Sequence, residues 1–360
     1  MRSLGLLSVA HAVNHAYAVL LPPIFLAIID EFDVTVSAVA ILAAVGAFAS
    51  GMVQFSYAEL TRRVSRRRLL GLGGILFGGG FAISAHIAGG NLGTVVIAVV
   101  GTPMLAVLGW RGVSIVFGVI AVLIGITILA LIRERGTDRA AAVAGGSSRD
   151  ALRRVLADRD LRWLFLTSVL GGGGRGLGVV NLFVLIYLTR VLGLDAATSG
   201  LMYGALIVFS VPMPLLAGWL SDRLGRKPLI IAAYLGGAIG FGVFIFAGSS
   251  LVWLWAGIVL MGLFSFAESP QLQALLADIA PPATRDASYA LYFTLAFGVG
   301  SLWTALYGLV IGALGEPIGV PVVFGLMAAS FVAAALATLP IRTDDTGART
   351  PAGILPPNGA

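Results

Sequence analysis

Eleven long apolar segments dominate the chain and constrain its fold more than any other feature. They occupy residues 4–29, 37–57, 69–88, 92–109, 113–132, 161–188, 197–217, 229–247, 251–276, 287–313 and 317–341. Each approaches the roughly 20 residues that a helix needs to cross a bilayer. A bilayer offers no hydrogen-bond partners to the backbone, so such segments cross it as helices. The sequence therefore predicts an all-α polytopic membrane protein with five segments in its first half and six in its second.

The composition supports a membrane protein and excludes other classes. Hydrophobic residues make up 58% of the chain and charged residues only 11%, whereas soluble proteins are about 45–50% apolar. The 23 Lys and Arg residues gather in connecting stretches, as the positive-inside rule describes, so we expect no nucleic-acid partner. The chain has no cysteine, and its three histidines lack a metal-ligand spacing. We expect no disulfide, no metal and no cofactor.

The order of the segments divides the chain into four parts. We expect an N-terminal helix bundle at 1–132, a cytoplasmic linker at 133–160, a six-helix bundle at 161–341 and a disordered tail at 342–360. Within the linker, Ser148 is a helix cap, and Leu152, Val155 and Leu156 form an apolar stripe. This pattern predicts a short amphipathic helix at the membrane surface.

The two halves repeat each other, as in many transporters. A shift of 160 residues places the basic stretch 58–69 on 218–229, whereas the later match of 116–118 with 323–325 needs a shift of 207. The first half is therefore 47 residues short and lacks a counterpart of segment 251–276. Either residues 71–90 do not cross the membrane fully or the second half is inverted. We favour the first alternative, because inversion would place the cations of 223–227 outside the cell.

A charged stretch joins the segments 197–217 and 229–247, and its sequence has the chemistry of a tight connection between two spanning helices. Gly218 is expected to allow close helix approach, and Gly225 to supply the backbone angles of a sharp reversal. Pro228 suits the first turn of the next helix. Asp222 is the anion available to pair with the cations of the stretch, which are Arg223, Arg226 and Lys227.

This stretch closely resembles the signature loop of the major facilitator superfamily of transporters. Residues 108–111 and 268–282 also resemble parts of that family, and the first helix is similar to that of fosmidomycin-resistance-type exporters. The resemblance implies two helix bundles around a central cavity that opens alternately to each side, often driven by a proton gradient. It also implies a small-molecule substrate and a cytoplasmic latch made of Gly218, Asp222, Arg223, Gly225, Arg226 and Lys227. We expect no enzymatic activity, because no nucleophile–base pair or metal set stands at a recognisable spacing.

Polar and ionisable residues inside the spans indicate the functional site, because charge there is costly and usually faces a cavity or a partner. Arg175 lies in the glycine-rich run 171–176, which predicts an interrupted helix that attracts an anionic or carboxylate-bearing substrate. His15, its counterpart at the shift of 160, is expected to titrate near neutral pH. Asn14 and Asn181 are expected to line the same site. Glu268, the only carboxylate deep in a second-half span, is the expected proton-coupling residue.

Each assignment has a structural alternative. An arginine inside a span can bond to backbone carbonyls, and Glu268 can serve a structural hydrogen bond. The sequence as a whole predicts a secondary transporter in the plasma membrane that exports a small organic or drug-like solute with proton coupling. The alternative is a shortened, non-transporting relative that acts as a binding or structural element. The sequence does not indicate an oligomeric state.

Overall fold

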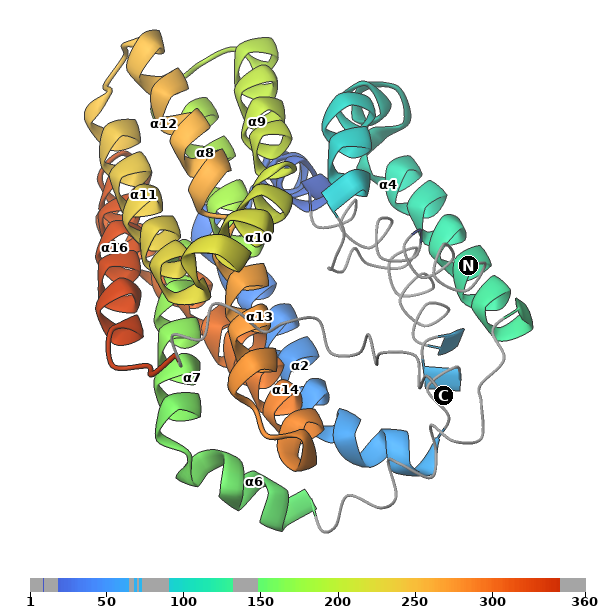
Figure 1. The fold of residues 1–360 in the computed structure, drawn as a ribbon. Helices are drawn as coiled ribbons and strands as arrows, with labels where there is room; N and C mark the ends of the chain where they lie inside the picture. The colour runs from blue at the N-terminus through green and yellow to red at the C-terminus, as the bar shows by residue number, and fades with distance from the viewer. Residues whose placement is uncertain are drawn as a thin grey trace, which may run out of the picture.

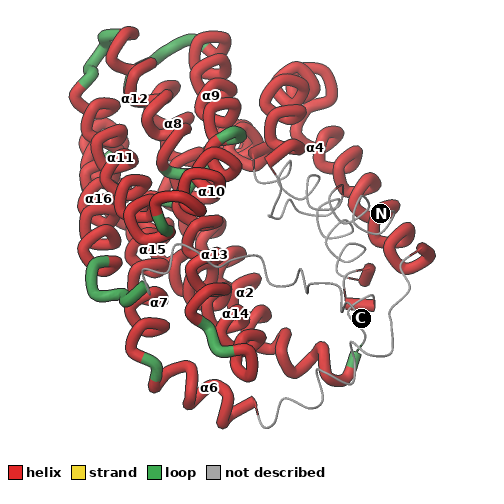
Figure 2. The backbone as a smooth tube through the Cα atoms, in the orientation of Figure 1, coloured by secondary structure: helices red, strands yellow, loops and turns green. Residues whose placement is uncertain are grey.

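The computed structural model describes residues 19–64, 68–69, 71–72, 91–131 and 148–343, together with residue 9. These residues form helices joined by short connections, and no strand occurs among them (Figure 2). Among these described residues, seven helices are long and apolar enough to cross a membrane, and the number is eight if a helix pair bent by 42° is taken as one further span. The predicted all-helical membrane architecture is confirmed. The number of eleven segments stays a prediction, because most of segment 69–88 lies outside the described residues.

The second half contains six spanning units, one for each predicted apolar segment (Figure 1). The first is the bent pair, made of α7 (Arg159–Gly171), η1 (Gly172–Gly174), η2 (Gly176–Val180), α8 (Asn181–Ile186) and η3 (Tyr187–Val191). The next three are α9 (Ala196–Ser210) with α10 (Met213–Leu224), α11 (Arg226–Phe246), and α12 (Leu251–Phe264) with α13 (Glu268–Ile279). The fifth unit consists of η4 (Pro282–Thr284), α14 (Arg285–Phe293), η5 (Thr294–Gly298), η6 (Val299–Ser301) and α15 (Leu302–Leu314). The sixth unit is α16 (Glu316–Thr338).

The described part of the first half consists of a helix at residues 19–32, α2 (Val36–Arg63) and α4 (Asn91–Leu131). Asp33, with φ 50°, follows the first of these helices, and Thr35 caps the start of α2 through its side chain. The long α4 changes direction at Gly109, where φ is 62° and ψ is 171°. The predicted segments 92–109 and 113–132 are therefore two helices that meet at this glycine.

Helix α2 of the first half packs along α14, η5, η6 and α15 of the second half, and α4 packs against α9. Small residues allow the close approach of α2. A Cβ added to Gly51 of α2 would lie 2.1 Å from the backbone nitrogen of Gly298. The Tyr203 hydroxyl of α9 donates to the Val19 carbonyl of the first helix at 2.7 Å.

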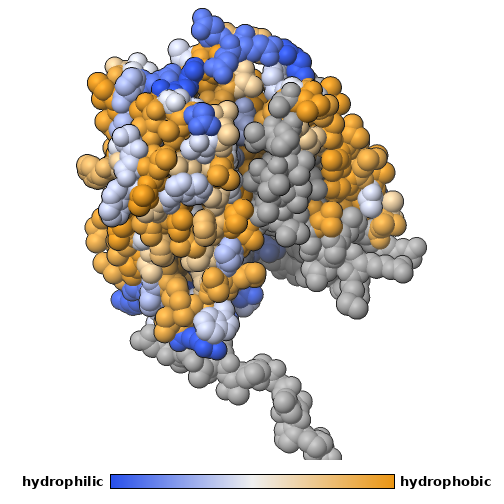
Figure 3. Space-filling model, turned by 90° about the horizontal axis from the view of Figure 1, so that it is seen from above, coloured by the Kyte–Doolittle hydropathy of each residue, from blue (hydrophilic) through white to orange (hydrophobic). Residues whose placement is uncertain are grey.

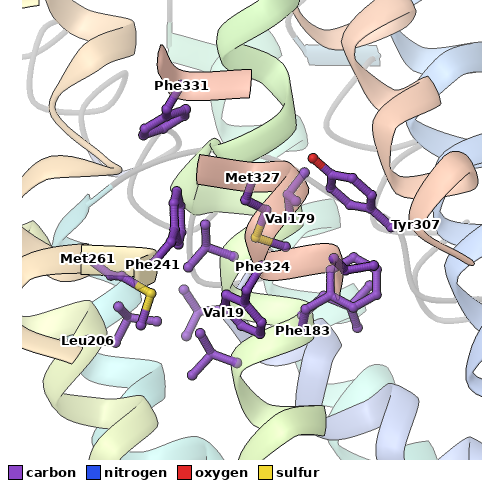
Figure 4. Close-up of a cluster of buried hydrophobic side chains, with 14 of the residues drawn as sticks. Val19, Val179, Phe183, Leu206, Phe241, Met261, Tyr307, Phe324, Met327 and Phe331 are labelled. Carbon is purple, nitrogen blue, oxygen red and sulfur yellow. The ribbon is translucent and has the colours of Figure 1, made fainter. Parts of the chain in front are cut away.

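The core of the second half consists of aromatic and aliphatic side chains, and much of the outer surface is apolar as well. Phe241 packs edge-on against Phe331 at 5.3 Å between ring centroids, and Val19 of the first helix joins the same cluster (Figure 4). On the outside, Phe246 is 88% exposed and Leu215 is 77% exposed. Apolar residues also cover much of the face that is seen from above in Figure 3. Large exposed apolar side chains around such a bundle suit contact with lipid.

The helix α6 (Ser148–Ala157) lies within the predicted linker and packs on the second half rather than standing apart. Ala151 and Val155 are buried, and α6 contacts both α7 and α14. The remaining linker residues 133–147 and the tail residues 344–360 lie outside the described part of the chain.

The connection within the charged stretch 218–228 is shorter than the sequence predicts, because most of the stretch is helical. Helix α10 continues to Leu224 and α11 begins at Arg226, so only Gly225 joins them. Gly225 has φ 90°, which confirms the need for glycine at the reversal. The prediction for Gly218 is wrong, because a Cβ added there would meet nothing within 4 Å. That glycine lies on an open side of α10 and does not bring two helices together.

Candidate functional site

Arg175 and Glu268 form a buried ion pair inside the second half. The Arg175 Nε donates to Glu268 Oε1 at 2.7 Å, and the two side chains are only 7% and 0% exposed. The other guanidinium nitrogens donate to the Ala296 carbonyl at 2.5 Å and the Ser168 carbonyl at 3.0 Å. The two residues are 93 positions apart in the sequence. The tertiary structure therefore unites two residues that the sequence nominated for separate roles.

Three interrupted helices meet at this pair. The bent pair of helices breaks at Arg175, between η1 and η2, and the Gly176 N–H donates to the Ser265 carbonyl at 2.8 Å, where α12 ends. Glu268 is the first residue of α13, so the positive end of that helix faces its carboxylate. Ala296 lies in the π-helical segment η5. A break in a helix leaves backbone N–H and C=O groups without their helical partners inside a membrane protein. Here the Arg175 guanidinium and the Glu268 carboxylate lie among such groups.

Glu268 has a second partner, which the sequence analysis missed. The Tyr234 hydroxyl of α11 lies 3.2 Å from Glu268 Oε2 and 3.4 Å from the Thr167 carbonyl. Tyr234 is fully buried, as is Tyr292 of α14. The available signal was a polar tip in the middle of an otherwise apolar span, since a buried tyrosine hydroxyl usually has a partner.

The glycine-rich run allows close packing around Arg175. A Cβ at Gly171 would lie 2.2 Å from the Tyr234 hydroxyl, and one at Gly174 would lie 2.6 Å from the Phe331 ring. A Cβ at Gly173 would approach the Ser330 side chain to 2.5 Å. The interrupted helix predicted here is present, and its glycines bring α11 and α16 against it.

The remaining predicted site residues are placed as follows. Asn181 is completely buried, and its Oδ1 accepts the Gly178 N–H at 2.9 Å, where φ is 94°. It therefore stabilises the second irregular turn of the bent helix pair. Asn14 and His15 lie outside the described residues. The substrate-binding role of these three residues and of Arg175 stays a prediction, as does the proton-coupling role of Glu268.

The charged stretch at Gly225 forms its own network at one end of the bundle. Arg226 pairs with Asp222 at 2.9 Å and with Asp278 at 3.4 Å, and it also bonds to the Ser221 hydroxyl. Lys227 donates to the carbonyl of Ile341 at 2.9 Å. These contacts tie the turn to α13 and to the residues after α16.

A second ionic network lies at the other end of the spans, where α9 and α16 begin. Arg190 lies 3.4 Å from Asp30 of the first helix and 3.4 Å from Glu316 of α16. We call these three residues the Arg190 network. It joins the two halves of the chain through one guanidinium.

Glu31, the residue next to Asp30, contacts α4 and not the Arg190 network. Glu31 accepts the Trp110 indole N–H at 2.6 Å and pairs with Arg111 at 2.7 Å. The Arg111 side chain, followed by Trp110, lowers the pKa of Glu31 below its ordinary value through these hydrogen bonds. The two residues that follow Gly109 are thereby fixed to the end of the first helix.

Apolar flanks, interrupted helices and a buried ion pair between them define a polytopic membrane protein with the architecture of a secondary transporter. The model of the Major Facilitator Superfamily matches residues 79–305 and 176–355, which is more than half of the chain. The chain belongs to this family, whose members are transporters rather than enzymes.

Curated relatives match parts of the chain. It is 30% identical over 148 residues to an uncharacterized MFS-type transporter, YqjV, of Bacillus subtilis (strain 168), covering 40% of this chain and 35% of that protein. It is 29% identical over 133 residues to a Na(+), Li(+), K(+)/H(+) antiporter of Planococcus maritimus, covering 34% and 30%. It is 32% identical over 117 residues to the class C tetracycline resistance protein of Escherichia coli, covering 31% and 28%. The matches thus span about a third of each relative's length.

Solved structures share the fold across nearly the whole chain. The MFS transporter FucP in its outward conformation has a TM-score of 0.62 at 16% identity, covering 93% of this chain and 98% of that one. A bacterial homologue of the lysosomal transporter Spinster, inward-facing and occupied, has a TM-score of 0.63 at 14% identity, covering 94% and 95%. At these identities the likeness is one of fold.

Proposed function

We propose that this protein is a secondary active transporter of the plasma membrane that exports a small organic or drug-like solute in exchange for protons, by alternating access. Membership of the Major Facilitator Superfamily supports transport. Relatives described as a cation/proton antiporter and a tetracycline resistance protein support exchange and efflux. The observation that carries the proposal is the buried pair of Arg175 and Glu268.

The pair sets the sign of the coupling between proton and solute. A carboxylate bound to Arg175 would displace Glu268 and favour its protonation, so that proton and solute would travel in the same direction. Other solute groups bind only while Glu268 is ionised, or only while Glu268 keeps Arg175 in place. Such a group competes with the proton, because protonation of Glu268 removes the state to which it binds. Export driven by an inward proton gradient requires this competition. We therefore propose that proton and solute exclude each other at Glu268, with Asn14, His15 and Asn181 completing the site.

The charged stretch 218–227 is proposed as the cytoplasmic latch. Asp222 and Arg226 bond within one half, and Asp278 adds a contact to α13. An exposed network of this kind forms and breaks at low cost. That property suits a contact that must open and close in each transport cycle.

Proton flux in proteoliposomes tests the proposal. With a trapped pH dye and an imposed pH gradient, the addition of tetracycline as the first probe is expected to dissipate the gradient in wild type but not in Glu268→Gln. Glu316→Gln removes a half-buried carboxylate of the same half that lies outside the buried pair. It serves as the control and is expected to retain flux. Absence of solute and proton flux from the wild-type protein across a panel of solutes would contradict the proposal.

A second candidate is a shortened family member that binds without transporting, and the 47-residue offset between the repeats favours it. Labelling of intact cells with a membrane-impermeant maleimide bears on this alternative, because the chain has no native cysteine. If only Ser249→Cys reacts and Ser148→Cys is protected, both halves have the orientation that transport requires. The opposite labelling pattern means an inverted second half and favours the non-transporting alternative.

A further inference from the structure

The hydroxyl of Tyr234 has one proton and two acceptors within reach. Glu268 Oε2 lies 3.2 Å away, and the Thr167 carbonyl lies 3.4 Å away. The ring is fully buried and packs edge-on against Phe331 at 5.0 Å between centroids. Because a phenol donates only one hydrogen bond at a time, Tyr234 can serve one of these acceptors or the other. The position of the ring itself is fixed.

We propose that Tyr234 is a positioning residue that adapts the site to both protonation states of Glu268. It donates to the ionised carboxylate, and it turns its hydroxyl proton toward the Thr167 carbonyl when Glu268 carries a proton. This inference rests on the proposed function, in which Glu268 exchanges protons. It adds to that function a residue that determines how readily the exchange occurs.

The hydrogen bonds balance in both states. With Glu268 ionised, Oε1 accepts from Arg175 and Oε2 accepts from Tyr234. When a proton from the aqueous phase binds Oε2, the new O–H donates to the Tyr234 oxygen, and Tyr234 donates onward to the Thr167 carbonyl. Tyr234 gains and loses no proton. The protons of Glu268 and Tyr234 each have an acceptor in both states, which avoids the cost of an unpaired group at these two residues.

The surroundings favour this role for Tyr234 over its neighbours. Among the described residues, the charged and titratable groups that face Glu268 are Arg175 of the interrupted helix, Tyr234 of α11 and Tyr292 of α14. Arg175 is permanently charged and donates to Oε1. No hydrogen bond joins the Tyr292 hydroxyl to Glu268 in the described part of the chain. Only Tyr234 therefore connects the carboxylate to a second acceptor.

The local sequence makes room for the hydroxyl. A Cβ at Gly171 would lie 2.2 Å from the Tyr234 oxygen, so any larger residue there would displace it. Gly171 belongs to α7, the helix that also supplies the Thr167 carbonyl. The glycine and the second acceptor thus occupy the same helix face, one turn apart.

Infrared titration of the Glu268 carboxyl group in nanodiscs tests the inference without relying on transport. Glu268→Gln assigns the band. Tyr234→Phe removes the donor to the ionised form, so the protonation midpoint of Glu268 is expected to rise by about one pH unit, a tenfold change in proton affinity. Tyr307→Phe is the matched control, because it removes an equally buried hydroxyl that donates to the Gly173 carbonyl at 2.8 Å. That control is expected to leave the midpoint unchanged.

The outcomes separate this inference from the proposed function. An unchanged midpoint in Tyr234→Phe, an equal rise in Tyr307→Phe, or a Glu268 that does not titrate in wild type overturns the inference. A shifted infrared midpoint without any proton flux in proteoliposomes leaves the inference standing and contradicts proton-coupled export. If Tyr234→Phe does not fold, Gly171→Ala displaces the hydroxyl and is expected to raise the midpoint, and an unchanged midpoint there also overturns the inference.

Discussion

The pair of Arg175 and Glu268 and the Arg190 network are built from the same kinds of side chain in opposite surroundings. The first pair is 7% and 0% exposed, whereas the members of the second are 30–70% exposed. In a dry interior, losing one partner leaves an uncompensated charge, whereas water replaces the lost partner at the surface. The number of ion pairs therefore says little about stability, because burial decides which of them the fold depends on.

Removing one charge from the buried pair is expected to have the largest effect. Glu268→Gln leaves Arg175 charged and buried, at a cost of about 3–5 kcal/mol. Its melting temperature in detergent should therefore fall far below that of wild type. Asp222→Asn, which removes one partner of Arg226 at a position with a 66% exposed side chain, is the surface counterpart and should change stability by less than about 1 kcal/mol. Equal melting temperatures for the two variants would contradict the comparison.

Packing of the glycine run next to the pair is expected to have the second largest effect. Gly174→Ala brings a Cβ to 2.6 Å from Phe331 and 2.8 Å from Phe241, and overpacking of this kind costs about 1–3 kcal/mol. Gly242→Ala is the control, because its Cβ would meet nothing within 4 Å. That variant should be neutral or more stable, since alanine favours a helix. A Gly174→Ala variant as stable as Gly242→Ala would show that the run is loosely packed.

The Arg190 network is expected to contribute little to stability and to respond to salt. Arg190→Gln should lower stability by about 1 kcal/mol or less at low ionic strength. At about 1 M salt the Debye length falls to about 3 Å, and the melting temperatures of wild type and Arg190→Gln should converge. The loss caused by Glu268→Gln should persist at high salt, because buried charges are screened much less. A salt-sensitive Glu268→Gln would place that carboxylate in contact with water.

The smallest effect is expected from Glu31. Its pKa is lowered from the ordinary 4.5 by Arg111 and Trp110, so its contribution to stability is present above the unfolded-state pKa and is lost as pH falls through the folded-state pKa. The melting temperatures of wild type and Glu31→Gln should differ slightly at neutral pH. They should converge in acid as the pH falls below 4.5 and through the lowered folded-state pKa. A difference that grows on acidification would reverse the sign and contradict this assignment.

Local patterns in the sequence were sufficient for much of the fold. Apolar length predicted all six spanning units of the second half, because the bilayer fixes how many residues a helix needs. The reversal at Gly225 was predicted because few other residues adopt φ near 90°. The prediction that Gly218 allows close helix approach was wrong. The neighbours of a glycine depend on the direction in which its helix face points, and the sequence of one helix does not specify that direction.

The sequence by itself determined that Arg175 and Glu268 would lie inside membrane spans, and that the helix around Arg175 would be interrupted. Both follow from residue type and local composition, which act within one segment. Only the tertiary structure decided that these two residues pair and that the Tyr234 hydroxyl lies within reach of both Glu268 and the Thr167 carbonyl. Such contacts depend on the rotation and depth of packed helices, which arise from the summed contacts of the bundle and not from any one segment.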